Sequence, residues 1–470
     1  MSKLPTNSSK LDKWQLVIVL TLSLGAALIC VGTPGIGFDE AATWWAARLE
    51  WPDLVRLLGN QDRNFGPYYA VMHIWMEVSD SLWWLRLPSA VGGALAVTAT
   101  AGLARQMFGA RTAWIAALLL VSAYSWVRFS QEVRPYSWSL AIATFATWAF
   151  ITLAERRSRR LIAIYLILMV LLPITHLFAA MAAGVQLVYA LVTRKRELAL
   201  LAVGGALPSL VAAVLVIGQI KQVSWLSVVT PLEALRELVG QSKAIWYVPI
   251  ALAACVGLAA YRWLQRGRST GPAEVALFIS WWAGPPFLLW IASVTVTPVY
   301  SARYVFWTLP AMILPAALLI SRMLDLPKLR IPVLLTVACL MVLALPGQVS
   351  ARAPNGHVWA PQVLTSVIID QSRPGDALVD PGFLALTVKY HLNDHHLPEP
   401  LVERTAQLEG KFVDQQVPLE QQAERLKNYE RLWVLDEIIS ERPLPVGFCR
   451  RDSWESDFAI ARLTLAGRCD

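Results

Sequence analysis

Long apolar runs, separated by short polar segments, occupy about the first three quarters of the chain. Most runs approach the roughly 20 residues that an α-helix needs to cross a bilayer. The pattern predicts about eleven membrane-spanning helices, at 16–31, 88–107, 113–129, 136–154, 161–175, 177–193, 198–218, 244–263, 274–296, 304–322 and 331–349. The run 67–78 is shorter and contains His73 and Glu77, so we expect it in a loop outside the membrane.

Composition supports a membrane protein. Hydrophobic residues make up 56% of the 470 residues and charged residues 16%, whereas soluble domains have about 25% charged residues. This excludes a disordered chain, a disulfide-dense mini-protein and an ordinary soluble enzyme. The net charge of +8 divides into +13 for residues 1–349 and −5 for residues 350–470. This division is typical of membrane topology rather than of a nucleic-acid-binding surface, so we expect no nucleic-acid partner.

The positive charges also predict the orientation of the helices. With the N-terminus in the cytoplasm, every inner connection has at least two cations. The outer connection at His176 has no cation, and the outer connection at 297–303 has only Arg303. The first run lacks an A-x-A cleavage site, so we expect an uncleaved helix. The excess of Arg over Lys is typical of a GC-rich bacterial genome, and we expect a bacterial plasma membrane. An odd number of spans places residues 350–470 outside the cytoplasm.

Residues 350–470 are expected to form a small extracytoplasmic α/β domain that follows the transmembrane domain of residues 1–349. Residues 373–380 read as a turn into a buried strand, 420–430 as a helix and 432–435 as a second strand. Cys449 and Cys469 lie in this tail, where an oxidising compartment permits a disulfide. Two unpaired thiols are the alternative. Cys30, Cys255 and Cys339 lie in apolar runs.

Ionisable residues gather on the predicted outer face. The first outer loop, 33–87, begins with Asp39 and Glu40. Its Trp44, Trp51, Val55 and Leu58 share one face of an expected interfacial helical segment, which Pro52 divides into two pieces. Further outer connections contain Glu132, Arg134, His176 and Arg303. Each has a structural alternative: Glu132 can pair with Arg134, His176 can be a packing residue, and Arg303 can extend its charge to the membrane surface.

Carboxylates and arginines beside a bilayer suit the transfer of a group from a lipid phosphate. An arginine would bind the phosphate, and a carboxylate would accept the proton of an acceptor hydroxyl. One such carboxylate is enough for an inverting sugar transfer. The chain has no Gly-rich phosphate loop, no H-E-x-x-H and no G-x-S-x-G. His391, Asp394, His395 and His396 leave a divalent metal conceivable, although a solvated turn explains them equally well.

Several short motifs resemble those of the GT-C superfamily of membrane glycosyltransferases, and of glycosyltransferase family 39-like proteins in particular. This group includes protein O-mannosyltransferases and the aminoarabinose transferases. The motifs lie within residues 14–322 and are Phe38-Asp39-Glu40-Ala41, Gly66-Pro67-Tyr68-Tyr69, Leu85-Arg86-Leu87-Pro88-Ser89, Phe108-Gly109, Ser130-Gln131-Glu132-Val133-Arg134-Pro135-Tyr136 and Ala302-Arg303-Tyr304. The resemblance implies a GT-C fold, a polyprenyl-phosphate sugar donor and Asp39 as the catalytic base.

The candidate site combines these motifs with the outer-face residues. Asp39, Glu40 and Glu132 are the catalytic candidates. The candidates for binding the donor and its phosphate are Gln131, Arg134, Tyr136, His176, Arg303 and Tyr304, and those for the acceptor are Asp62, Tyr68 and Tyr69. The chain departs from the family pattern at two places. The aminoarabinose transferases have Lys-Pro-Pro-Leu where this chain has Phe65-Gly66-Pro67-Tyr68, which contains no lysine. The acidic residue of the second outer loop is often Asp in the family and is Glu132 here. The missing lysine speaks against an aminoarabinose donor and leaves a hexose or a pentose as the sugar, whereas the change to glutamate bears on the role of residue 132.

Two other functions remain compatible with the sequence. A transporter or flippase of a lipid-linked saccharide would place ionisable groups near mid-membrane, often in inverted repeats; mid-span charges are scarce here. A polymerase or ligase of lipid-linked glycans would differ in product length. The acceptor of the expected transferase is a lipid, a glycan or a protein.

Overall fold

The structure is a computed structural model that describes residues 10–223, 226–240, 271–357, 362–379, 382, 384–392, 395–437, 443–456 and 461–469. The expected span at 244–263, Cys255 and Asp394 lie outside these residues. The chain forms two compact units: Met1–Val31 with Arg86–Ala351, and Gly32–Leu85 with Arg352–Asp470. The tail therefore clusters with the first outer loop rather than forming a unit of its own.

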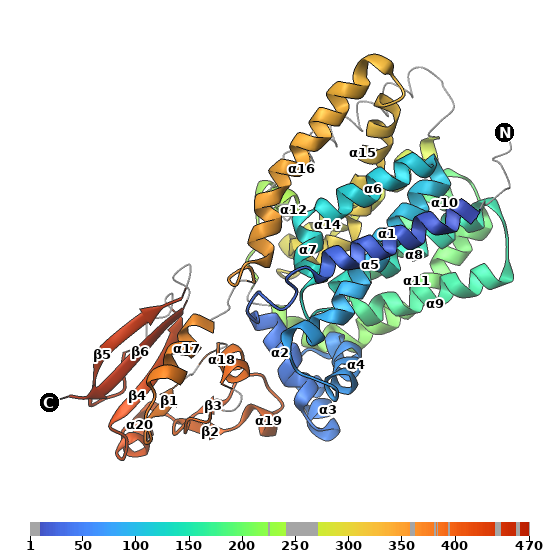
Figure 1. The fold of residues 1–470 in the computed structure, drawn as a ribbon. Helices are drawn as coiled ribbons and strands as arrows, with labels where there is room; N and C mark the ends of the chain where they lie inside the picture. The colour runs from blue at the N-terminus through green and yellow to red at the C-terminus, as the bar shows by residue number, and fades with distance from the viewer. Residues whose placement is uncertain are drawn as a thin grey trace. The chain divides into compact units, whose positions relative to one another are not determined.

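The first unit is helical (Figure 1). Its elements are α1 (Lys10–Leu28), α5 (Leu82–Phe108, which begins in the other unit), α6 (Ala110–Ser122), α7 (Tyr124–Ser130), α8 (Tyr136–Glu155), α9 (Arg159–Thr175), η2 (Leu177–Met181), α10 (Ala182–Val192), α11 (Arg196–Val216), η3 (Ile217–Val223), α12 (Pro231–Gly240), α14 (Pro272–Thr295), η4 (Ala302–Thr308), α15 (Pro310–Met323), η5 (Pro327–Leu329) and α16 (Arg330–Arg352).

Ten of the eleven expected spans coincide with these helices. Among the described residues, five helices are long and apolar enough to cross a membrane, or seven if each bent pair is one span; others, such as Trp14–Leu28 and Leu177–Val192, are shorter. Two runs expected as single helices are broken. The run 113–129 bends by 70° at Ala123 between α6 and α7, and 304–322 bends by 46° between η4 and α15.

Burial separates central from peripheral helices. The apolar windows of α5 and α8 are 72% and 78% buried, whereas that of η5–α16, along the edge of the unit in Figure 1, is 11% buried. Ala90, Ala94 and Ala101 of α5 are completely buried, and side chains of this size allow close packing between membrane helices. In α16, Ile331, Leu334 and Val342 are exposed, as a lipid-facing surface requires.

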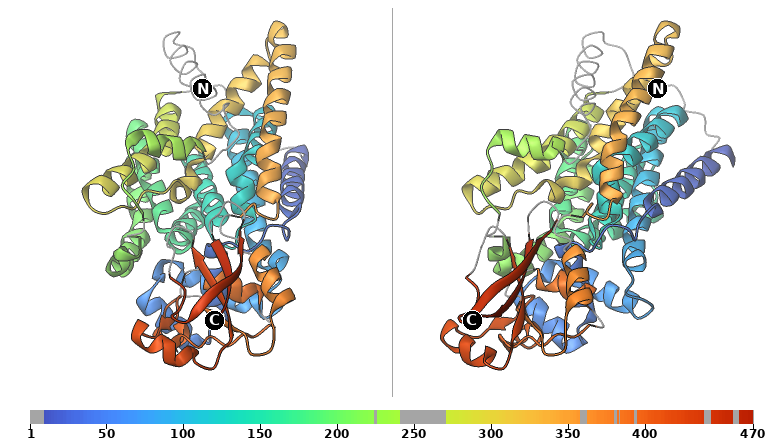
Figure 2. Two further views of the ribbon diagram at one scale, coloured as in Figure 1. Left: turned by 90° about the vertical axis from the view of Figure 1, so that its left-hand side faces the viewer. Right: turned by 60° about the vertical axis from the view of Figure 1, so that its left-hand side comes forward.

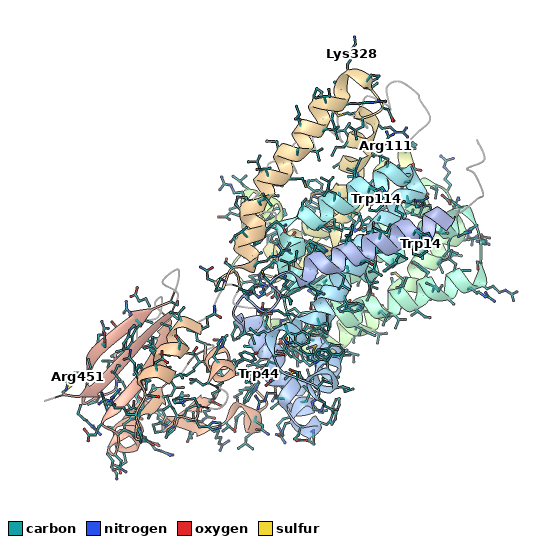
Figure 3. The ribbon with its side chains drawn as sticks, in the orientation of Figure 1. Trp14, Trp44, Arg111, Trp114, Lys328 and Arg451 are labelled. Carbon is teal, nitrogen blue, oxygen red and sulfur yellow. A yellow bond between two sulfur atoms is a disulfide. The ribbon has the colours of Figure 1, made fainter. Side chains whose placement is uncertain are left out.

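An ion pair joins two connections between helices of this unit. Arg111 at the start of α6 pairs with Asp325 after α15 at 2.5 Å. Figure 3 labels Arg111 and also Lys328, which lies in the same connection as Asp325. The sequence predicts both of these connections to be on the inner side, and the orientation of the helices stays a prediction.

The second unit begins with helices of the first outer loop, namely α2 (Phe38–Arg48), α3 (Trp51–Asn60), η1 (Arg63–Phe65) and α4 (Gly66–Met76). The expected shared face is wrong. Trp44 is buried and packs edge-on against Tyr390 at 5.1 Å, whereas Trp51 and Val55 are exposed. The segment is divided into two helices as expected, but the break lies at Leu49 and Glu50, and Pro52 is in the first turn of α3. The two helices therefore do not continue one periodic pattern.

The tail adds the α/β part of the second unit. Its elements are α17 (Gln362–Gln371), β1 (Ala377–Val379), α18 (Ala385–His391), β2 (Val402–Arg404), α19 (Ala406–Glu409), β3 (Gln415–Gln416), α20 (Leu419–Leu426), β4 (Arg431–Glu437), β5 (Phe448–Glu455) and β6 (Ala461–Arg468). The sheet order is β1-β4-β6-β5, with β1 parallel to β4 and the other pairs antiparallel. The expected buried strand, helix and second strand correspond to β1, α20 and β4.

Apolar side chains cover both faces of this sheet. Alternate residues of β4 point to opposite faces, so Trp433 packs with Ile368 and Val388 of α17 and α18, while Val434 packs with Leu426 of α20. Figure 2 shows the sheet and these helices in two further views. The buried indole of Trp433 donates to Oδ2 of Asp376 at 2.9 Å, which satisfies its polar atom.

Candidate functional site

The connection between α7 and α8 carries three candidate residues and is almost completely buried, with Gln131, Glu132 and Arg134 each at most 3% exposed. Oε2 of Glu132 lies 2.7 Å from Nη1 of Arg128, four residues earlier. The structure thus pairs Glu132 with Arg128, and the pairing of Glu132 with Arg134 stays a prediction. Sequence reasoning missed Arg128, although its spacing to Glu132 is the one that brings helical side chains together.

Backbone contacts hold this connection in place. The side-chain amide of Gln131 donates to the carbonyls of Ala27 and Ile29, both at 2.7 Å, which satisfies acceptors at the C-terminal end of α1. Ser89 of α5 donates to the carbonyl of Arg134 at 3.2 Å. Gln131 therefore links the connection to α1, and Ser89 links it to α5. These two contacts hold the backbone of the connection in place.

Four other candidates meet in an aromatic cluster although they are far apart in sequence. The ring of His176 lies 5.5 Å from Tyr136 and 5.3 Å from Tyr304. The guanidinium of Arg303 lies over the Tyr304 ring at 5.5 Å. These residues come from the start of α8, the connection before η2 and the start of η4, so three helix ends bring them together.

His176 is neutral at ordinary pH. Burial disfavours its charged form, and the positive charge of Arg303 adds to this effect, so the pKa of His176 falls to about 3. Its side chain lies in the connection between α9 and η2, outside both helices. Arg303 is therefore the permanent positive charge of the cluster, and the imidazole supplies a neutral ring.

Asp39 and Glu40 belong to the second unit and lie in the first turn of α2. Asp39 is half-buried, and Glu40 is completely buried. Oε2 of Glu40 accepts a hydrogen bond from the backbone N–H of Gly37 at 3.0 Å and lies 2.7 Å from Nδ1 of His357. Carboxylates are favourable at a helix N-terminus because of its exposed N–H groups and dipole. Sequence reasoning did not find His357.

The expected acceptor residues are also in the second unit. The hydroxyl of Tyr69 donates to Oδ2 of Asp62 at 2.7 Å, and the Tyr69 side chain is completely buried. Asp62 adopts φ +50°, which an aspartate tolerates better than most residues. Tyr68, also near the start of α4, is buried. The structure thus gives Asp62 and Tyr69 a role in fixing the turn before α4.

A disulfide joins Cys449 at the start of β5 to Cys469 after β6, with the Cα atoms 5.1 Å apart. Cys30 and Cys339 are free thiols. Within the described part of the chain, no three His, Cys, Asp or Glu residues lie close enough to hold a metal ion. His395 instead forms a 2.7 Å hydrogen bond with Ser372.

Residues 67–225 match the family model described as dolichyl-phosphate-mannose-protein mannosyltransferase. Among solved structures, the chain is similar to ArnT from Cupriavidus metallidurans in the apo state, with a TM-score of 0.63 and 16% identity over 97% of this chain and 98% of that one. The same protein bound to undecaprenyl phosphate gives a TM-score of 0.60 at 15% identity, with the same coverage of both chains.

The oligosaccharyltransferase AglB from Archaeoglobus fulgidus, in complex with an inhibitory peptide and a dolichol-phosphate, gives a TM-score of 0.51 and 13% identity over 92% of this chain and 70% of that one. No sequence among the curated proteins matches the chain. The described helices and the matches over nearly the whole length agree with each other, and the chain therefore has the fold of the GT-C membrane glycosyltransferases.

Proposed function

We propose that the chain is an inverting glycosyltransferase that moves a sugar from a polyprenyl-phosphate donor to a lipid, glycan or protein acceptor at the outer face of a bacterial plasma membrane. The observation that carries this proposal is the GT-C fold, which matches ArnT bound to undecaprenyl phosphate over 97% of the chain. The family match to residues 67–225, which include Glu132, Arg134 and His176, supports the same class of donor.

In the proposed reaction, Asp39 is the general base. It takes the proton of the acceptor hydroxyl as the hydroxyl oxygen bonds to the anomeric carbon of the sugar. The bond between that carbon and the phosphate oxygen breaks, and polyprenyl phosphate leaves. Because Asp39 is half-buried at a helix N-terminus, it remains reachable from outside while its backbone is held by the first turn of α2.

The arginines would act on the leaving group. Arg303 and Arg134 carry planar guanidinium groups that match the oxygens of a phosphate. Negative charge builds up on that phosphate as the glycosidic bond breaks, and fixed positive charges stabilise it more than they stabilise the donor. His176, being neutral, leaves Arg303 as the cation of its cluster.

The test is the variant Asp39→Asn in membranes given labelled polyprenyl-phosphate sugars, with label measured in the lipid, glycan and protein fractions. Loss of a general base lowers rates by about 10²–10⁴-fold, and we expect a loss in that range. Asp53→Asn is the matched control, because Asp53 also lies in the first turn of a helix of the same unit. Transfer that persists in Asp39→Asn at equal expression would remove Asp39 as the base.

A further inference from the structure

A buried histidine of the tail contacts the first turn of α2. The side chains of His357 and Glu40 are both completely shielded from solvent, and Nδ1 of His357 lies 2.7 Å from Oε2 of Glu40. The two residues are 317 positions apart in the chain and belong to the same unit. With Glu40 ionised, Nδ1 carries the hydrogen and donates it, so this is a charge-assisted hydrogen bond in a water-free place.

Glu40 in turn holds the beginning of α2. The same oxygen, Oε2, accepts the backbone N–H of Gly37, the residue immediately before the helix. This contact is the part of a capping box in which the third helical residue reaches back to the cap. Asp39 lies between Gly37 and Glu40, so the position of the Glu40 carboxylate determines the backbone path on which Asp39 stands.

A second contact joins the same two segments. The backbone N–H of Gly35 donates to the carbonyl of Pro354 at 2.9 Å. That carbonyl also accepts the side-chain amide of Gln362 at 2.8 Å, which connects it to α17. The residues just before α2 and those just before His357 therefore run beside each other, and the tail holds the approach to α2 as well as its first turn.

Tail residues also contact the far part of α2. Tyr390 of α18 packs edge-on against Trp44 at 5.1 Å, and its hydroxyl donates to the carbonyl of Asp80 at 3.0 Å. The ammonium of Lys389 lies 5.9 Å from the centre of the Trp45 ring. These contacts hold the body of α2, whereas His357 contacts the turn that carries the two acids.

We propose that His357 is a positioning residue for the transferase reaction: through Glu40 it fixes the first turn of α2, and so keeps Asp39 aimed at the acceptor hydroxyl. This inference rests on the proposed function. It makes the tail part of the catalytic apparatus, because removing one tail side chain changes the geometry of a base that lies more than 300 residues earlier.

The test compares three substitutions at His357 in the full chain. In His357→Asn the amide nitrogen takes the place of Nδ1, so the hydrogen bond to Glu40 can form. In His357→Gln the amide reaches the position of Nε2 instead, and His357→Leu has no donor. A misplacement of about 1 Å costs roughly 10²-fold in rate. We expect His357→Leu and His357→Gln to lower kcat by about 10- to 100-fold, with the donor KM changed less than about 3-fold. We expect His357→Asn to keep most of the activity.

His395→Leu is the matched control, because His395 is another histidine of the tail with a 2.7 Å side-chain hydrogen bond, to Ser372. We expect it to leave kcat and KM unchanged. Hydrogen exchange at Gly37 gives a readout that needs no substrate: its amide should exchange faster in His357→Leu and as slowly as in the unaltered protein in His357→Asn.

The outcomes separate the two proposals. If the unaltered protein transfers sugar, Asp39→Asn does not, and His357→Leu keeps the full kcat, then the positioning role is wrong and the function stands. Equal loss in Asn, Gln and Leu, with a similar loss of thermal stability, would also overturn the positioning role, since it would mean that any change at this site unfolds the unit. If no polyprenyl-phosphate sugar is used while exchange at Gly37 responds as expected, the proposed function fails instead.

Discussion

The guanidinium of Arg128 lies 2.7 Å from the carboxylate of Glu132, and the two side chains are only 16% and 4% exposed. Removing one partner of a buried pair leaves a charge in a poorly solvated place, which costs about 3–5 kcal/mol, whereas removing both charges costs much less. The pair connects the end of α7 to the connection that carries Glu132 and Arg134. We therefore expect Arg128 to be essential for the stability of this connection.

The first prediction concerns this pair. We expect Arg128→Met to lower the free energy of unfolding by about 3 kcal/mol, and adding Glu132→Gln to recover part of the loss. Thermal unfolding in detergent measures both. Arg111→Met is the control, because it breaks the Arg111–Asp325 pair, whose side chains are more than half exposed; such pairs contribute about 0–1 kcal/mol. Additive losses in the double variant would show that Arg128 and Glu132 do not stabilise each other.

The second prediction is a pH dependence at His176. Its pKa is about 3 in the folded protein, below the usual value near 6.5, because burial and Arg303 disfavour the charged form. Between these two pH values only the unfolded chain binds the proton. The contribution of His176 to stability is therefore complete above pH 6.5 and is lost as the pH falls, by about 2 kcal/mol at pH 5.

The variant His176→Phe keeps a ring beside Tyr136 and Tyr304 but cannot titrate. We expect its unfolding midpoint to fall less than that of the unaltered protein when the pH is lowered from 7.5 to 5. Comparing the two drops cancels the titration of the other groups. Equal drops in both proteins would mean that His176 is already protonated or hydrated in the folded state.

The third prediction concerns the close approach of α5 to Ser130, the last residue of α7. A Cβ atom at Gly93 would lie 2.0 Å from Oγ and 2.8 Å from Cβ of Ser130. The carbonyl of Gly93 also accepts the indole N–H of Trp126 at 3.0 Å. Gly93→Ala should therefore push the helices apart and cost about 1–3 kcal/mol, measured as a lower unfolding midpoint.

Two further variants test this explanation. Adding Ser130→Gly to Gly93→Ala removes the atoms that the new methyl group meets, and we expect it to restore part of the lost stability. Gly204→Ala in α11 meets nothing within 4 Å, so it should be neutral or slightly stabilising, as alanine is in a helix. If Gly93→Ala and Gly204→Ala behave alike, close packing at Gly93 is not what sets its identity.

The sequence predicted the helices well because spanning length and apolar composition depend only on neighbouring residues. It predicted Asp39, Glu132 and His176 as polar groups at helix ends for the same reason. It did not predict the break at Ala123, where neither Pro nor Gly interrupts the run, nor the burial of Trp44, which depends on Tyr390.

The contact between Glu40 and His357 was beyond sequence reasoning for a similar reason. A buried hydrogen bond between residues 317 positions apart has no local pattern. Arg128 is different, because its i,i+4 spacing to Glu132 is visible in the sequence and was overlooked in favour of the nearer Arg134. Tertiary contacts, rather than local preference, thus determine most of what was missed.

The last prediction concerns the disulfide. Cys449 and Cys469 close a loop of about 20 residues that contains strands β5 and β6. These strands also pair by their backbones, and the N–H of Cys469 donates to the carbonyl of Gly447 at 3.0 Å. The folded structure is therefore held without the bond. The bond acts mainly by restricting the unfolded chain, which stabilises the fold by about 3 kcal/mol for a loop of this length.

Replacing both cysteines by serine should keep transfer activity at low temperature but lower the unfolding midpoint. Alkylation of the unfolded but unreduced protein, followed by mass analysis, should leave both residues unmodified while the free thiols of Cys30 and Cys339 react. Modification of Cys449 and Cys469 would show that the bond is absent from the purified protein.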